Sequence, residues 1–131
     1  MSEHQVEQSA QLWSLSGARS SIIHQKTFLI RDAVSFNAML QEHNPGFEPI
    51  PVVDFVKYDV VACFAGLCST GGYAVTLKSI SLEGNSSHVT FLITTPAPGA
   101  IVTQAFARPF FMTAVRKLKG NPVVSAEVQK H

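Results

Sequence analysis

The chain has 131 residues, of which 46% are hydrophobic and 15% charged, and its formal net charge is +1. A chain of this length can bury a core as one domain. The near-zero charge argues against a nucleic-acid binder, which normally carries a basic stripe, and residues 116–119 are the only basic cluster. No apolar run approaches the roughly 20 residues of a membrane span, so none is predicted.

The N-terminal thirty residues predict a tail followed by two strands. Residues 1–10 are polar and without periodicity, and we expect a flexible tail before a single β-rich domain over residues 11–131. Residues 11–16 alternate apolar and polar side chains, and residues 21–30 have strand composition. Because Gly17 interrupts the pattern between them, the two segments predict a first β-hairpin.

The next segment changes to helical periodicity. Asp32 is a favourable N-cap, and Phe36 and Leu40 lie one helical turn apart. Residues 44–46, Asn-Pro-Gly, are strong stop signals. The pattern predicts one amphipathic helix over residues 33–43, held on the sheet by its Phe36/Leu40 stripe because so short a helix is marginal alone.

A proline-rich extended connection, residues 47–54, leads to the stretch around which we expect the fold to form. Residues 58–66 are an apolar run of strand length, which indicates a strand buried on both faces. Residues 73–80 alternate with period two, as a half-buried strand does. The pair Gly71-Gly72 between them indicates a tight reversal, so a central β-hairpin with a glycine-rich tip is predicted.

The remaining chain reads as short strands separated by turns. The pattern predicts a turn at 83–87, strands at 88–94, 101–107, 110–118 and 123–128, and a stiff proline loop at 95–100. The total is about seven or eight strands and one helix. This predicts a mainly β (α+β) fold with an antiparallel sheet curled into a barrel or a sandwich.

The residue types that carry chemistry are sparse. Cys63 and Cys68 are close in sequence on the predicted hairpin, and two free thiols are expected, with a disulfide as the less favoured alternative. No histidine stands at ligand spacing, so no metal or other cofactor is expected. Asp54 and Asp59 flank the start of a strand and are interpreted as caps. No catalytic residue is predicted, and the protein is expected not to be an enzyme.

Two loops carry the features of a binding surface. Residues 69–73 have two interpretations. In the structural one, a glycine supplies a positive φ angle and Thr70 bonds the loop backbone. In the functional one, the glycines let the backbone of a partner approach closely. The loop at 95–100 is stiff and would lose little entropy on binding. The predicted binding residues are Ser69, Thr70, Gly71, Gly72, Tyr73, Pro96, Pro98, Gly99 and Arg108.

Several short motifs occur in a characteristic order. They are residues 60–66 (VVACFAG), 69–75 (STGGYAV), 96–99 (PAPG), 102–105 (VTQA) and 108–110 (RPF). The ordered set over residues 54–115 resembles the C-terminal domain of the protease complex subunit PrcB family. The resemblance implies a bacterial accessory protein, often exported or lipid-anchored, that associates with a protease complex and has no catalytic residues.

A looser resemblance concerns the glycine loop alone. Residues 70–73, Thr-Gly-Gly-Tyr, are similar to the Thr-Thr-Gly-Tyr/Phe loop of chagasin-like cysteine-protease inhibitors. The Asn-Pro that precedes the loop in that family is replaced here by Leu67-Cys68-Ser69. The resemblance implies a contact with a protease and leaves inhibition open.

The leading hypothesis is a non-catalytic protein-binding domain, an accessory subunit or modulator of a protease. The alternative is a small-ligand or enzymatic pocket inside a β-barrel, with Cys63, His88 or Arg108 as polar anchors. A homo-oligomer built by the apolar strands is a third hypothesis. The N-terminus lacks a signal region, which fits either a cytoplasmic protein or a periplasmic or otherwise exported domain whose signal was removed.

Overall fold

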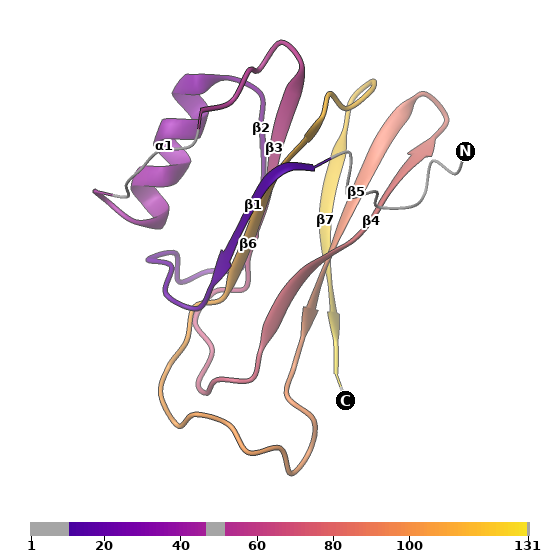
Figure 1. Cartoon of the computed structure of the whole chain (residues 1–131). Helices are drawn as coiled ribbons and strands as arrows, with labels where there is room; N and C mark the ends of the chain where they lie inside the picture. The colour runs from indigo at the N-terminus through magenta and orange to yellow at the C-terminus, as the bar shows by residue number, and fades with distance from the viewer. Residues whose placement is uncertain (1–10, 47–51, 131) are drawn as a thin grey trace.

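The computed structural model describes residues 11–46 and 52–130, which form two β-sheets and one helix (Figure 1). The elements are β1 (Gln11–Gly17), β2 (Lys26–Ile30), α1 (Ala33–His43), β3 (Tyr58–Phe64), β4 (Ala74–Glu83), β5 (Ser86–Thr94), β6 (Phe110–Arg116) and β7 (Val123–Gln129). One sheet has the order β1-β6-β3-β2 and the other β4-β5-β7. The predicted tail and most of the proline connection (residues 47–51) lie outside the described residues.

The helix forms where the sequence predicts it and covers the outer face of the four-stranded sheet (Figure 1). Asp32 caps it, since its carboxylate accepts the Ser35 amide at 2.7 Å. Phe36 and Leu40 are buried against Ala62 and other side chains of the sheet. This packing confirms the predicted apolar stripe, and it makes the four-stranded sheet the middle of three layers.

The strand β3 is buried on both faces, as its apolar run predicts, because each face meets a different layer. Val60, Ala62 and Phe64 point toward the helix, whereas Val61 and Cys63 point toward the second sheet. The second sheet contributes apolar side chains to the same core, namely Val75, Val89, Phe91 and Ile93. The prediction of a barrel or sandwich is therefore confirmed as a sandwich of two sheets that do not close into a barrel.

A β-bulge corrects the predicted alternation of β4. Leu77 pairs with Phe91, but the next pair joins Ser79 to Thr90, so Lys78 is an extra residue in the strand. The extra residue reverses which side chains after it point toward the other sheet. Ile80 consequently packs in the inter-sheet core together with Leu77. Simple period-two counting would place Ile80 on the outer face.

Both predicted hairpins are wrong in their pairing, although their strands exist. The strand β3 pairs with β2 and β6, and β4 pairs with β5 in the other sheet. Likewise β1 pairs with β6, and both β6 and β3 separate it from β2. Residues 65–73 cross from one sheet to the other, and packed sheets lie about 10 Å apart. A hairpin loop joins neighbouring strands of one sheet and usually has only about two to five residues.

The strand predicted at residues 101–107 is also wrong. This segment belongs to the long connection between β5 and β6, and its one β-bridge joins Ala107 to Cys68. The connection must leave the second sheet at Thr94 and reach the first sheet at Phe110. Its apolar residues therefore lie in the connection between the two sheets and do not pair in a β-strand. The strands predicted at 88–94, 110–118 and 123–128 are confirmed as β5, β6 and β7.

A buried carboxylate fixes the end of the sandwich at which β3 begins. Asp59 is fully buried, and its Oδ1 lies 2.8 Å from Lys117 Nζ and 3.2 Å from Arg31 Nε. Its Oδ2 accepts the amide of Leu118 at 2.9 Å. Asp59 is thus the centre of an ion-pair network rather than a strand cap, while Asp54 does cap a turn by accepting the Val56 amide at 3.0 Å.

Candidate functional site: a loop tip at one end of the sandwich

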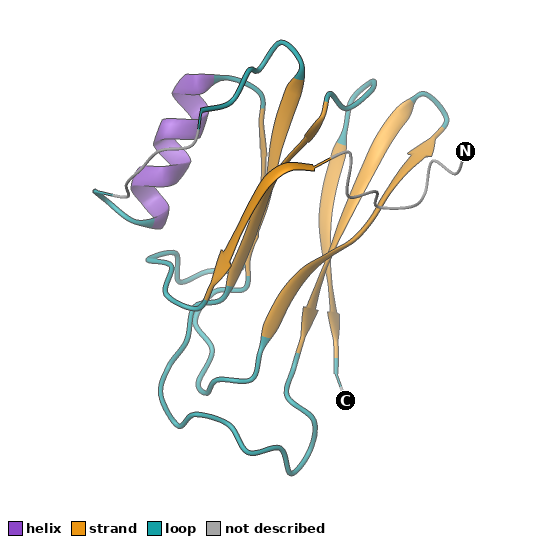
Figure 2. Cartoon of the chain, in the orientation of Figure 1, coloured by secondary structure: helices purple, strands orange, loops and turns teal. Residues whose placement is uncertain are grey.

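The two predicted binding loops lie at the same end of the molecule because both cross between the sheets there (Figure 2). Residues 65–73 carry the chain from β3 to β4, and residues 95–109 carry it back from β5 to β6. A third loop, residues 18–25, joins β1 to β2 beside them. We call these three loops the tip.

Backbone hydrogen bonds tie the three loops together. The Gly71 amide donates to the Thr103 carbonyl at 2.9 Å, and Cys68 and Ala107 exchange amide-to-carbonyl bonds of 2.8 and 2.9 Å. The Leu67 amide donates to the carbonyl of Ile23 at 3.0 Å. Each loop is thus held by its neighbour, so the tip is preorganised although little of it is regular secondary structure.

Gly72 shows how closely the loops approach. Its φ is +87°, a conformation that other residues rarely adopt, and a Cβ there would lie 2.6 Å from Val102 Cγ1 and 3.1 Å from Pro96 Cγ. This supports the structural interpretation of the glycine pair. Thr70 supports it as well, since its hydroxyl donates to the Gly71 carbonyl at 3.0 Å.

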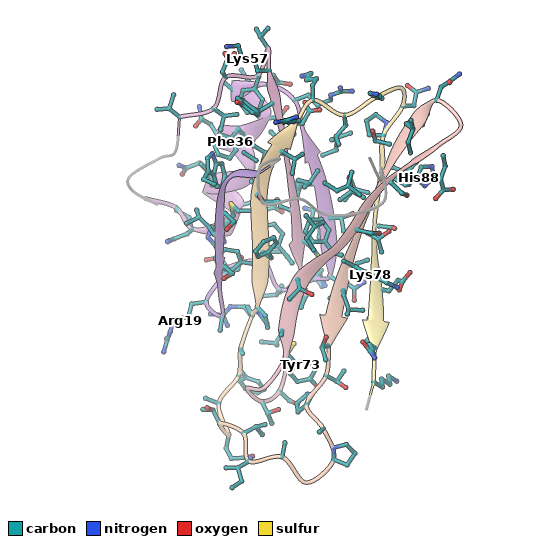
Figure 3. The ribbon with its side chains drawn as sticks, turned by 45° about the vertical axis from the view of Figure 1, so that its right-hand side comes forward. Arg19, Phe36, Lys57, Tyr73, Lys78 and His88 are labelled. Carbon is teal, nitrogen blue, oxygen red and sulfur yellow. The ribbon has the colours of Figure 1, made fainter. Side chains whose placement is uncertain are left out.

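The predicted binding residues differ in how far their side chains are exposed. Ser69, Gly72, Pro98 and Gly99 are exposed, while Thr70, Gly71, Tyr73 and Pro96 are half-buried. Tyr73 lies at the base of the tip, where β4 begins (Figure 3). Arg108 is half-buried and is engaged by the third loop, because its Nε donates to the Ser20 carbonyl.

The most exposed apolar side chains of the tip were not among the predicted binding residues. Ile101 is fully exposed, Phe106 is 70% exposed, Ile23 is 54% exposed and Leu67 is 51% exposed. Ile101 and Phe106 were missed because their segment has strand composition and was assigned to a strand. The proline and glycine signals on its N-terminal side were the available indication that the loop continues.

Charged residues are nearly absent from the tip. Residues 60–77 and 89–107 contain none, and the three loops together hold only Arg19 and Arg108. Arg19 is exposed on the third loop of the tip, at the end of the molecule that Tyr73 also marks (Figure 3). The tip therefore presents apolar area with a positive border.

Next to the tip, a buried polar pair connects the end of α1 to the third loop. His43 Nδ1 lies 2.9 Å from Ser20 Oγ, which also accepts the Ile22 amide at 3.1 Å. Burial lowers the pKa of His43, whose ring packs 4.4 Å from that of Phe110 between centroids. Ser20 is fully buried, so this serine and histidine join structural elements and do not face a substrate.

The groups of the alternative pocket are not brought together. Cys63 is fully buried in the inter-sheet core, His88 lies on β5 beside the turn at the opposite end, and Arg108 is at the tip. Both cysteines are free thiols, and burial raises the pKa of Cys63 to about 12, which keeps its thiol unreactive. Burial also raises the pKa of Cys68.

The described residues contain no cluster of three or more His, Cys, Asp or Glu side chains that could hold a metal ion. Within the same part of the chain, no helix has the length and apolar character needed to cross a membrane.

The molecule is thus a two-sheet β-domain that joins three loops into one tip. Residues 60–116 match the family model described as PrcB C-terminal, which confirms the resemblance seen in the ordered motifs. The match runs from β3 through β6 and includes both crossing loops, while α1, β1, β2 and β7 lie outside it. No curated protein and no solved structure matches the chain.

Proposed function

We propose that this chain is a non-catalytic protein-binding domain that acts as an accessory subunit or modulator of a protease and binds its partner through the tip. The observation that carries the proposal is the joining of residues 69–73 to the 95–109 loop by the bond from Gly71 to Thr103. A preorganised loop loses little conformational entropy on binding, so exposed side chains on it contribute more of their contact energy to affinity.

The match to the PrcB C-terminal family supports the kind of partner. The resemblance to that family implies association with a protease complex, and the matched residues 60–116 include both loops. The interior supports a surface function. Between the sheets lie apolar side chains such as Phe91 and Val115, so the core is packed where the alternative hypothesis needs a pocket.

The test is co-purification of the tagged full chain with a protease encoded beside its gene. The variant is the double substitution Thr70→Ala/Tyr73→Ala, which removes two half-buried side chains of the glycine loop. The control is Val34→Ala, because Val34 is 80% exposed on α1, away from the tip. We expect wild type and control to retain the protease and the double variant to lose it. Equal retention by all three proteins would contradict the proposal.

A further inference from the structure

The bridge between Cys68 and Ala107 defines an outer face of the tip. These two residues form a hydrogen-bonded antiparallel pair, and both side chains are buried. Since side chains alternate along paired strands, their neighbours point the other way. Leu67, Ser69 and Phe106 are accordingly exposed. Two loops distant in sequence thus place a leucine and a phenylalanine on one outward surface.

Ile23 extends this surface onto the third loop. Its carbonyl accepts the Leu67 amide at 3.0 Å, and its side chain is 54% exposed. We call Ile23, Leu67 and Phe106 the apolar face. Aromatic side chains are enriched at protein interfaces, and side chains held on a preorganised backbone lose less entropy on binding.

The charged residues next to the apolar face have one sign. Arg19 and Arg108 are the only charged residues in the three loops, a β-bridge joins them, and Arg108 directly follows Ala107 of the bridge to Cys68. We call these two arginines the border of the apolar face. The carboxylates on the elements that end nearby are already matched, since Glu42 lies 2.7 Å from Lys26 Nζ and Glu127 lies 2.7 Å from Lys78 Nζ. The border therefore favours a partner that brings negative charge.

We infer that the apolar face binds a protein segment whose apolar side chains are bordered by aspartate or glutamate. The inference rests on the proposed function and names both the anchor residues and the chemistry of the partner. A second copy of the chain fits poorly, because two tips would bring their Arg19 borders together. The anchors Leu67 and Phe106 supply affinity, and Arg19 selects against basic segments.

The experiment selects displayed random 12-residue peptides on the immobilised full chain and measures the affinity of synthetic versions of the enriched peptides. The anchor variant is Leu67→Ser/Phe106→Ser, with Val34→Ser as a matched control because Val34 is exposed on α1. The charge variant is Arg19→Glu, with Lys57→Glu as its control, since Lys57 is exposed at the opposite end (Figure 3).

We expect enriched peptides to combine Asp or Glu with large apolar residues. The anchor variant should bind them at least about tenfold more weakly, and Arg19→Glu about three- to tenfold more weakly at low salt, while both controls change affinity less than about twofold. Peptides that bind the tip but carry no acidic residues would overturn the inference and leave the proposed protein-binding function standing.

Two other results would overturn it in favour of a different occupant. The first is binding of vesicles of phosphatidylcholine and phosphatidylglycerol that the anchor variant loses, with no peptide distinguishing that variant from wild type. The second is a concentration-dependent dimer, seen by light scattering, that the anchor variant abolishes. Loss of protease co-purification in the Thr70→Ala/Tyr73→Ala variant remains an independent test of the proposed function.

Discussion

The two ends of the sandwich are stabilised in opposite ways. At the end where β3 begins, Asp59 is fully buried and pairs with Arg31 and Lys117. At the tip, backbone hydrogen bonds and the close fit of Gly72 hold the loops, and apolar side chains remain exposed. Charged side chains thus provide most of the polar contacts at one end. At the tip the backbone and one arginine, Arg108, hold the loops, and apolar side chains remain available for contacts.

The largest expected effect tests the charged end. Replacing Asp59 with alanine leaves two cations and the Leu118 amide without their buried acceptor. We expect a loss of about 3 kcal/mol in unfolding free energy, at the low end of the range for broken buried pairs because both cations are partly exposed. Urea denaturation measures it.

The control for this prediction is Asp54→Ala, which removes a cap from an exposed turn. It should cost about 1 kcal/mol or less. If Asp59→Ala were as mild as Asp54→Ala, the ion-pair network would not be what holds this end together.

The second effect tests the tip backbone. Gly72→Ala meets Val102 Cγ1 and also places alanine at φ +87°. We expect a loss of about 2 kcal/mol by urea denaturation, made up of strain and overpacking. Gly99→Ala has a similar φ of +79° but open space around it, so it should lose only about 1 kcal/mol.

A double variant separates the two causes. Gly72→Ala/Val102→Ala removes the nearest atom that the new Cβ would meet and leaves Pro96 Cγ, 3.1 Å from it. It should recover most of the steric part of the loss and keep the part due to the backbone conformation. No recovery would mean that the two loops are not in contact there.

A third prediction concerns acid. Burial lowers the pKa of His43 below its unfolded value, so below about pH 6.5 the unfolded chain binds more protons than the folded one. The contribution of His43 to stability is therefore fully present above about pH 6.5 and is lost as the pH falls through its folded pKa. Urea denaturation at several pH values should show this fall in wild type and a flatter profile in His43→Gln. Parallel profiles would contradict it.

The smallest expected effect tests whether the side chains of the apolar face contribute to the stability of the fold. Leu67→Ser/Phe106→Ser replaces two side chains that are more than half exposed. We expect a loss of less than about 1 kcal/mol in unfolding free energy. A larger loss would show that these side chains stabilise the tip, and the comparison between the two ends would then fail.

Local signals in the sequence predicted local structure well. The cap at Asp32 and the spacing of Phe36 and Leu40 give the helix its observed bounds, because both act within a few residues. The double burial of β3 also follows from its composition. Its partners do not, because pairing depends on segments far along the chain, such as β6.

The same limit explains what was missed at the tip. The glycine and proline loops were predicted to carry the features of a binding surface, and they lie at one end of the molecule, joined by the bond from Gly71 to Thr103. Ile101 and Phe106 were hidden by a composition that suits a strand equally well. Only the crossing from Thr94 to Phe110 shows that these residues cannot join a ladder.

The position of β6 has a consequence for biosynthesis. It lies between β1 and β3 and supplies partners to both, yet it leaves the ribosome after both of them. During translation β1 and one edge of the apolar β3 must wait without that neighbour, and closing such long chain loops is slow. We therefore expect this sheet to remain incomplete until β6 has been synthesised, with a nascent chain that needs protection from aggregation up to that point.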